Sequence, residues 1–352
     1  MNKLKIGIIG VGSISEEHIE AYLRIPEVEL YAFCDLNPER LDFMSKKYNI
    51  TRTFTDYDEM LKCAEIDAVS VCVWNSQHAP CAIAALKAGK HVLCEKPMAT
   101  SAEEGRQMLV AAKESGKLLM IGFVRRYGQD TQIIQDFKND GFFGELYYGK
   151  AVYLRRHGNP GGWFGDKSRS GGGPLIDLAV HTIDLLRYLF GNPKPVSVYG
   201  VTFKKELDKT NLKDKVSYES ASKTDHDIND VETLAMATIR FDTGAVISVE
   251  VSFELNIKEP YGTLDIYGDK GGAKLMPTLE LYNQTSGYLT NVGLNIATKL
   301  DFDILFESEL RHFVDCIQNG TQCKSPAEDG VEIMRILDAI YESARTGHEV
   351  VL

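Results

Sequence analysis

The segment LKIGIIGVGSIS (residues 4–15) carries most of the information about the fold. An apolar, strand-like run leads directly into Gly10-x-Gly12-x-x-Ser15, and a helix-like stretch follows. The first glycine of such a pattern permits a tight turn, the second lets a pyrophosphate approach the backbone, and a small third residue allows close helix–strand packing. The helix N-terminus adds amide donors and a favourable dipole. We therefore expect Gly10, Gly12, Ser13 and Ile14 to bind a dinucleotide.

An acidic residue follows at the position expected for a ribose contact. Asp35 ends the second strand-like run, about 20 residues beyond the glycine pattern, where dinucleotide-binding folds place the acid that accepts the ribose hydroxyls. Asp35 could instead simply begin a turn into the next helix. The charge of Asp35 would repel a 2′-phosphate. The next residue is the apolar Leu36, where a phosphate-binding enzyme would favour a small polar or basic side chain. The nearby cation Arg40 lies beside Glu39, which offsets its charge. These residues predict NAD as the cofactor, in preference to NADP.

Residues 1–122 alternate strand-like and helix-like segments. Apolar runs occur at 4–9, 28–34, 68–74, 91–94 and 118–121, and amphipathic stretches at 38–48, 79–88 and 102–115. Near-continuous apolar strands separated by helices indicate a parallel sheet covered on both faces. Right-handed crossovers then predict an α/β, Rossmann-type doubly wound domain over residues 1–122.

The pattern changes in residues 123–352. Helix-like segments at 129–139 and 174–190 flank a strand at 146–154 and a Gly-rich loop at 158–173. Strand-like runs then follow one another at 233–241, 245–253 and 264–267, with a hairpin turn signal in FDTGAV (241–246), before helices at 302–318 and 327–344. The segment 204–227 is charged and polar, which indicates a mobile excursion from the main body of the domain. We expect an α+β domain for substrate binding and oligomerisation, with a large, mostly antiparallel, open-faced sheet.

Composition narrows the range of partners. The 352-residue chain has a formal charge of −11, which argues against nucleic-acid or anionic-membrane partners. No apolar run approaches the roughly 18 residues of a membrane span, and the first apolar stretch is too short for a signal peptide. None of the seven cysteines forms a CxxC pair. We expect free thiols in the cytoplasm and no metal site.

Three strings resemble those of a known enzyme family. They are AGKHVLCEKP (88–97), GGGPLIDLAVHTIDLLRYLFG (171–191) and SPAEDGVEIMRILDAIYESARTG (325–347). The first resembles the signature of the Gfo/Idh/MocA oxidoreductases, the second that family's GGG-x-x-x-D-x-x-x-H-x-x-D helix, and the third its closing helix. The resemblance implies that Lys96 is catalytic and also contacts cofactor and substrate, that Glu95 lies near the nicotinamide ribose, and that Pro97 fixes the loop.

The second string supplies the remaining catalytic candidates. Asp177 and His181 are four residues apart, so a helix would project both from one face. His181 is suited to accept a hydroxyl proton at neutral pH, and Asp177 could orient it. Both are also candidate substrate contacts. Asp184 either orients His181 or stabilises the helix. The alternatives are a helix-dipole role for Asp177 and a core histidine at 181.

One stretch departs from the resembled pattern. The family commonly has Thr-Pro-Asn-x-x-His where this chain has VWNSQH (73–78). Asn75 and His78 remain candidate cofactor contacts, and Trp74 either flanks the cofactor or packs. Further substrate candidates are Arg125, with Arg126 and Tyr127 as alternatives, and His157, Asn159, Trp163 and Tyr261. The simplest interpretation of His18 and His91 is structural.

The resemblance predicts an NAD-dependent dehydrogenase that acts on a secondary hydroxyl of a sugar or cyclic polyol. Two alternatives stay open: an NAD-dependent glycoside hydrolase of the same family, and a non-catalytic NAD-binding regulator. The open sheet face of the second domain needs cover. Because members of the resembled family bury such a face against another subunit, the resemblance implies a homodimer or homotetramer formed through the strands of residues 230–270.

Overall fold

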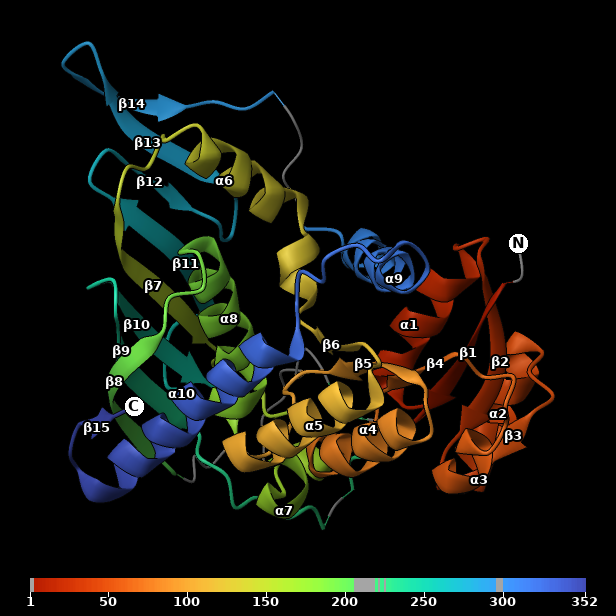
Figure 1. Ribbon diagram of the computed structural model, residues 1–352. Helices are drawn as coiled ribbons and strands as arrows, with labels where there is room; N and C mark the ends of the chain where they lie inside the picture. The colour runs from red at the N-terminus through yellow and green to blue at the C-terminus, as the bar shows by residue number, and fades with distance from the viewer. Residues whose placement is uncertain (1–2, 206–218, 221, 225, 296–299) are drawn as a thin grey trace. The chain divides into compact units, whose positions relative to one another are not determined.

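The computed structural model describes residues 3–205, 219–220, 222–224, 226–295 and 300–352. The chain divides into two compact units (Figure 1). Unit 1 comprises Met1–Tyr127 and Asp301–Met334, and unit 2 comprises Gly128–Leu300 and Arg335–Leu352.

Unit 1 is built on a parallel sheet of six strands in the order β3-β2-β1-β4-β5-β6. The strands are β1 (Leu4–Ile9), β2 (Val28–Cys34), β3 (Thr53–Phe54), β4 (Ala68–Val71), β5 (His91–Glu95) and β6 (Leu119–Gly122). The strand order reverses between β1 and β4, which is where such sheets bind ligands at the carboxyl ends of their strands. The predicted doubly wound fold is confirmed.

Helices cover both faces of this sheet. They are α1 (Ser13–Leu23), α2 (Pro38–Tyr48), α3 (Tyr57–Leu61), α4 (His78–Lys87), α5 (Ala102–Ser115) and α9 (Phe302–Asn319), with 3₁₀ turns η1 (Asn75–Gln77) and η2 (Val124–Tyr127). Helix α4 packs on α5 and α1 packs on α9, and Figure 1 shows the two pairs on opposite sides of the strands. Because both faces are covered, strand residues such as Ile6, Ile8 and Val69 are fully buried.

Helix α9 packs within unit 1, whereas the sequence analysis assigned residues 123–352 to the second domain. Its apolar face, with Leu310 and Phe313, is buried. The Phe306 ring lies 5.7 Å from the His18 ring of α1. The amphipathic pattern of α9 predicts that one face is buried, but not the unit on which it is buried.

Unit 2 contains, among the described residues, a sheet of nine strands in the order β14-β13-β12-β11-β7-β10-β9-β8-β15. The strands are β7 (Leu146–Leu154), β8 (Pro195–Phe203), β9 (Leu234–Phe241), β10 (Val246–Ser252), β11 (Tyr261–Gly268), β12 (Gly271–Lys274), β13 (Glu280–Thr285), β14 (Tyr288–Val292) and β15 (Val350–Val351). Strand β10 pairs parallel with β7, and the other pairings are antiparallel. The prediction of a mostly antiparallel sheet is confirmed.

One face of this sheet carries helices. Helix α8 (Val180–Leu189) packs on β7, β10 and β11, and α6 (Gln129–Asn139) packs on α8. The other helical segments of this unit are η3 (Gly162–Phe164), α7 (Lys167–Ser170), the π-helical turn η4 (Leu175–Ala179) and the part of α10 (Ala327–Thr346) from Arg335 onward. Along β9, residues 235, 237, 239 and 241 are buried, while 236, 238 and 240 are exposed. This alternation marks a sheet with one covered face and one open face.

The predicted polar excursion at 204–227 lies mostly outside the described residues. Within the part of the chain that the structure describes, no helix is both long and apolar enough to cross a membrane.

Candidate active site

The turn after β1 has the backbone geometry that the glycine pattern predicts. Gly10 has a φ of +86°, and a Cβ at this position would lie 2.6 Å from the carbonyl oxygen of Cys72. A Cβ at Gly12, by contrast, would meet no atom of the described residues within 4 Å. Helix α1 begins directly after Gly12, and no described side chain caps its N-terminus. The turn therefore has no room for a side chain at Gly10, where the chain after β4 lies close, and open space at Gly12. The positive end of helix α1 next to this open space suits a pyrophosphate.

Asp35 lies at the carboxyl end of β2, beside this turn. Its Oδ2 accepts a hydrogen bond from the Val11 amide at 2.8 Å, and its Oδ1 accepts one from the Asn37 amide at 2.8 Å. The side chain is only half-buried, and each carboxylate oxygen keeps a second lone pair. The Asp35 carboxylate thus has a fixed position from which it can accept ribose hydroxyls, and the residues present fit a dinucleotide.

Arg40, the cation nearest to Asp35 in the sequence, is engaged with the protein itself. Its Nε donates to the carbonyl oxygen of Val11 at 2.7 Å, and its Nη2 pairs with Glu16 Oε1 at 2.6 Å. Glu16 also pairs with Lys47 at 2.6 Å. The sequence predicts that Glu39 offsets the charge of Arg40, whereas in the structure Glu16 of α1 pairs with Arg40. A 2′-phosphate would have to compete with Glu16 for this guanidinium.

The loop Glu95-Lys96-Pro97 begins at the carboxyl end of β5, an interior strand of the sheet. Lys96 is half-buried and Glu95 is buried. The Lys96 amide donates to Glu95 Oε2 at 3.1 Å, and the Lys96–Pro97 peptide is cis. The Glu95 side chain thus contacts the backbone of the residue that carries the candidate catalytic amine.

The other carboxylate oxygen of Glu95 is held by a residue that the sequence analysis interpreted as structural. His18 Nε2 lies 2.8 Å from Glu95 Oε1, and His18 is fully buried on α1. Burial alone would lower the pKa of His18, but its interactions with Cys72 and Glu95 raise that pKa to about 10. Burial likewise opposes ionisation of Glu95, yet its pairing with His18 lowers the Glu95 pKa. The two groups form a buried ion pair behind Lys96.

His78 links the same loop to the end of β4. Its Nδ1 lies 2.6 Å from the carbonyl oxygen of Pro97, and its Nε2 lies 3.0 Å from that of Val73. Burial lowers the pKa of His78, although its contacts with the two carbonyls oppose the shift. Asn75 is buried and Trp74 half-buried in the adjoining turn. Both ring nitrogens of His78 face protein carbonyls, which suits a residue that holds the loop.

In unit 2, the glycine-rich string enters a π-helical turn rather than the continuous α-helix that the sequence predicts. Glu232 organises this entry: its Oε2 accepts from the Gly173 amide at 3.0 Å, and its Oε1 accepts from the Leu175 amide at 3.1 Å and from the Tyr341 hydroxyl at 3.0 Å. Burial raises the pKa of Glu232 although these donors oppose the shift. A Cβ at Gly172 or Gly173 would collide with Tyr341 or Glu232. Sequence reasoning missed Glu232, which no local motif marks.

The candidate proton-transfer residues lie on this segment. Asp177 belongs to η4, and its amide donates to the carbonyl oxygen of Gly173 at 3.0 Å; His181 lies in the first turn of α8. Both are half-buried, whereas Asp184 is almost completely buried. The π-helical turn widens the backbone just before His181, and such turns occur frequently at functional sites.

The remaining candidates are distributed between the two units. Arg125 is half-buried in η2, but Arg126 is buried and pairs with Asp329 at 2.8 Å, and the Tyr127 hydroxyl contacts Ser325. Of these three, Arg125 remains the candidate substrate contact.

In unit 2, His157 Nδ1 lies 3.2 Å from Glu254 Oε1. Asn159 bonds with Asn229 and with the Gly161 amide, and the Trp163 ring stacks on Phe164 at 4.0 Å. Tyr261 is exposed at the start of β11. His157 is held by Glu254, and Tyr261 is exposed at the end of an interior strand of the sheet.

The glycine turn, Asp35 and the Glu95-Lys96-Pro97 loop lie at the carboxyl ends of β1, β2 and β5, and a second α/β unit follows. This arrangement is typical of dinucleotide-dependent oxidoreductases with a Rossmann domain. The profile of an oxidoreductase family with an NAD-binding Rossmann fold matches residues 4–123, and that of the family's C-terminal α/β domain matches residues 139–352. The chain belongs to the Gfo/Idh/MocA family of NAD-binding oxidoreductases, as the three sequence strings predict.

Individual relatives share this architecture. The chain is 33% identical to the D-glucoside 3-dehydrogenase of Escherichia coli (strain K12), over 99% of this chain and 97% of that protein. It is 27% identical to the myo-inositol 2-dehydrogenase of Thermotoga maritima, over 93% and 92%. A solved structure of a levoglucosan dehydrogenase in complex with NADH superposes with a TM-score of 0.86 at 25% identity and covers 99% of each chain.

Proposed function

We propose that this protein catalyses the reversible, NAD-dependent oxidation of a secondary hydroxyl on a sugar or cyclic polyol. The observation that carries the proposal is the loop Glu95-Lys96-Pro97, which is held at the carboxyl end of β5 by His18 and His78. The relatives named above are dehydrogenases of a glucoside, an inositol and levoglucosan, all cyclic compounds with several hydroxyls. A glycoside is therefore the first substrate class to test.

The cofactor is held by the first two strand ends. Gly10, Gly12, Ser13 and Ile14 bind the pyrophosphate through backbone amides, and Asp35 accepts hydrogen bonds from the adenine ribose. Asn75 lines the same edge, while His78 acts by holding Pro97. When bound, NAD would supply the acceptor for the hydride of the substrate carbon, and NADH would supply the hydride in the reverse direction.

Lys96 contacts both cofactor and substrate in this proposal. Its ammonium stabilises the negative charge that develops on the substrate oxygen as the hydroxyl proton leaves. Glu95 lies near the nicotinamide ribose and holds the Lys96 amide, as its 3.1 Å contact supports. Because Lys96 is only half-buried, its amine is accessible to a ligand.

Asp177 and His181 carry out the proton transfer. His181 accepts the hydroxyl proton, because a neutral imidazole is a suitable base near neutral pH. Asp177 orients the ring and stabilises its charged form. Arg125 and His157 are substrate contacts that select among hydroxylated ligands, and Glu232 fixes the backbone that carries Asp177 by accepting from the Gly173 and Leu175 amides.

A substrate panel tests the activity. Glucosides, free sugars, inositols and nucleotide sugars are incubated with NAD, and NADH formation is followed by its absorbance, with the Lys96→Ala variant as the matched control. We expect NADH formation with at least one cyclic polyhydroxy compound, abolished in the variant. Release of sugar from a glycoside without net NADH would identify the glycoside hydrolase alternative. NAD binding without turnover of any panel member would favour the regulator.

We also propose that the protein is a cytoplasmic homo-oligomer with neither nucleic-acid nor membrane partners. The seven free cysteines suit a reducing compartment, and the charge of −11 disfavours polyanions. On the open face, exposed Met236, Thr238 and Arg240 of β9 lie in one row, which a second subunit would cover. Light scattering should show a dimer or tetramer that Thr238→Glu weakens; a monomer at micromolar concentration would contradict this assembly.

A further inference from the structure

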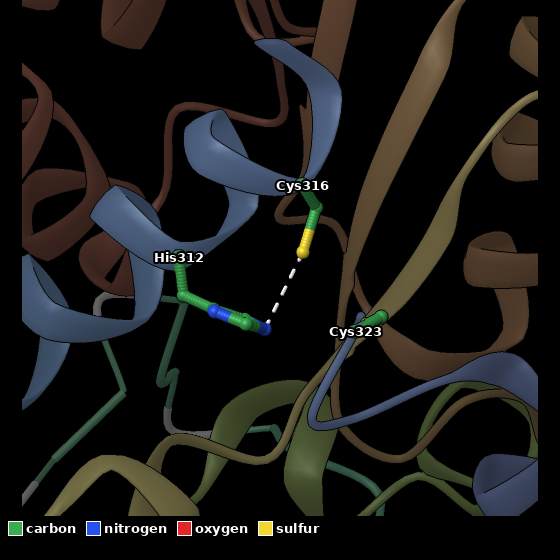
Figure 2. A group of neighbouring side chains, drawn as sticks. All are labelled: His312, Cys316 and Cys323. Carbon is green, nitrogen blue, oxygen red and sulfur yellow. Dashed lines mark hydrogen bonds between the residues drawn. The ribbon is translucent and has the colours of Figure 1, made fainter. Parts of the chain in front are cut away.

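A cluster of one histidine and two cysteines lies in unit 1, outside the elements assigned to cofactor and substrate. His312 and Cys316 project from the same face of α9, one turn apart, and Cys323 lies in the loop between α9 and α10 (Figure 2). The imidazole nitrogen and the two sulfur atoms all lie within 4.8 Å of one another. The cluster brings together the side chains that soft divalent metal ions prefer.

The geometry is close to that of a bound zinc ion. With metal–ligand distances of about 2.0–2.3 Å, a tetrahedral zinc ion places neighbouring nitrogen and sulfur ligands roughly 3.5–3.8 Å apart. Cys316 Sγ already lies 3.4 Å from His312 Nε2. The three ligand atoms lie at most 4.8 Å apart, so the longest of these distances must shorten by about 1 Å to match a zinc site. A change in cysteine rotamer can supply this shift. All three residues are half-buried, so an ion can reach the cluster from solvent.

The loop that carries Cys323 is held in place by contacts on its C-terminal side. The Ile121 amide donates to the Ser325 carbonyl at 3.0 Å, and Arg126 Nη1 donates to the Lys324 carbonyl at 2.6 Å. On the helix side, Gly320 ends α9 in the left-handed conformation with φ +70°. The ligand positions are therefore largely preorganised, and binding an ion does not require the loop to fold.

Two features set the requirements that a metal must meet. The Lys324 amide donates to His312 Nε2 at 3.0 Å, so a metal must replace this donor at the ring nitrogen. An ion must also displace the thiol protons of Cys316 and Cys323, as thiolate-binding metals do.

We propose that His312, Cys316 and Cys323 form a three-ligand site for a soft divalent metal ion, for which zinc is the best match, with water as the fourth ligand. Binding replaces two S–H protons by two metal–sulfur bonds and releases two protons. It joins the last turn of α9 to the 320–326 loop and so stabilises unit 1. The sequence predicts no metal site, because the cysteines are scattered, odd in number and form no CxxC pair.

Cobalt provides a direct spectroscopic probe. The full-length protein, kept in reductant and freed of metal by a chelator, is titrated with Co²⁺ alone. We expect thiolate-to-cobalt charge-transfer absorption that saturates at one ion per chain and disappears when Zn²⁺ is added. Cys316→Ser and Cys323→Ser should abolish it, while the control Cys63→Ser, at another half-buried free cysteine, should retain it. Absorption that is absent, or unchanged in Cys316→Ser, overturns the proposal.

A second measurement uses the unsubstituted protein, so it does not depend on the folding of a variant. Alkylation followed by mass spectrometry should show that Zn²⁺ protects Cys316 and Cys323 but leaves Cys63 at its original rate. Equal rates at Cys316 with and without zinc, or a Cys316–Cys323 disulfide in protein kept in reductant, contradict the site. NAD titration of the same samples tests the cofactor turn separately, so failure of either inference is distinguishable from failure of the other.

Discussion

Replacing His18 by glutamine should change how the stability of unit 1 depends on pH. The His18 pKa is raised from 6.5 to about 10, so the folded chain binds the imidazole proton more tightly than the unfolded chain does. The stabilisation is complete below about pH 6.5 and is lost as pH rises toward about 10. The contacts of the buried imidazole with Cys72 and Glu95 are the cause, because they hold its proton in the folded chain.

Glutamine keeps a hydrogen-bond donor near Glu95 but removes the charge. Glu95 then remains in a buried position without its cation, which typically costs about 3–5 kcal/mol. Because the Glu95 pKa is lowered in the native protein, its contribution is present above its usual value of 4.5 and is lost on acidification. The gap between the native protein and His18→Gln should therefore be largest near pH 6 and should narrow steadily toward pH 10.

Tryptophan fluorescence can report unit 1 selectively. The chain has two tryptophans, Trp74 in unit 1 and Trp163 in unit 2. In a Trp163→Phe background, denaturant unfolding at pH 6, 8 and 10 follows Trp74 alone. The control His348→Gln removes an exposed histidine of unit 2 and should leave the pH profile unchanged. A gap for His18→Gln that is equal at pH 6 and pH 10 would refute a charged His18.

Four further variants test the cofactor and catalytic assignments. Lys96→Ala should lower kcat by about 10² to 10⁴ while NAD affinity, measured by calorimetry, stays within a few-fold; near-full turnover would remove Lys96 from catalysis. His181→Ala should cost a similar factor and flatten the rise of oxidation rate with pH, and an unaltered pH–rate profile would contradict its role as the base. The native protein should bind NAD at least about tenfold more tightly than NADP, on the order of 1.4 kcal/mol; Asp35→Ser combined with Leu36→Arg should narrow or invert that ratio, and equal binding by the native protein would exclude the assigned role of Asp35. Gly10→Ala should abolish NAD binding and destabilise unit 1 by about 1–3 kcal/mol, because its Cβ would lie 2.6 Å from the Cys72 carbonyl oxygen; unchanged NAD titration would show that the turn can move.

Much of the architecture follows from local sequence signals. The bounds predicted for β1, β2, α2, α5, α6 and β7 agree with the structure, because apolar periodicity and capping residues act over a few neighbouring positions. The glycine turn, Asp35 and the strings around Lys96 and His181 identify the family and its cofactor for the same reason. Each is a short segment whose pattern can be recognised without knowing which other segments pack against it.

Other features depend on segments that meet only when the chain folds. His18 and Glu95 are 77 residues apart, and neither periodicity nor spacing reveals that a buried histidine has a carboxylate partner. Glu232 bonds to Gly173 across 59 residues and holds the entry to a π-helical turn, where the sequence predicts an ordinary helix. Burying a charge is costly unless an oppositely charged or hydrogen-bonding partner lies beside it. Whether a distant residue takes that place is decided by the tertiary fold.

The sequence by itself determined the fold class, the family, the cofactor and many of the longer helices and strands. The tertiary structure decided that α9 returns to unit 1, that β10 pairs parallel with β7, and that Cys323 lies beside His312 and Cys316. The physical reason is the range of the interactions. Backbone propensity and amphipathic periodicity are local, whereas the choice of packing partner depends on the burial of apolar and charged groups that are distant in the chain.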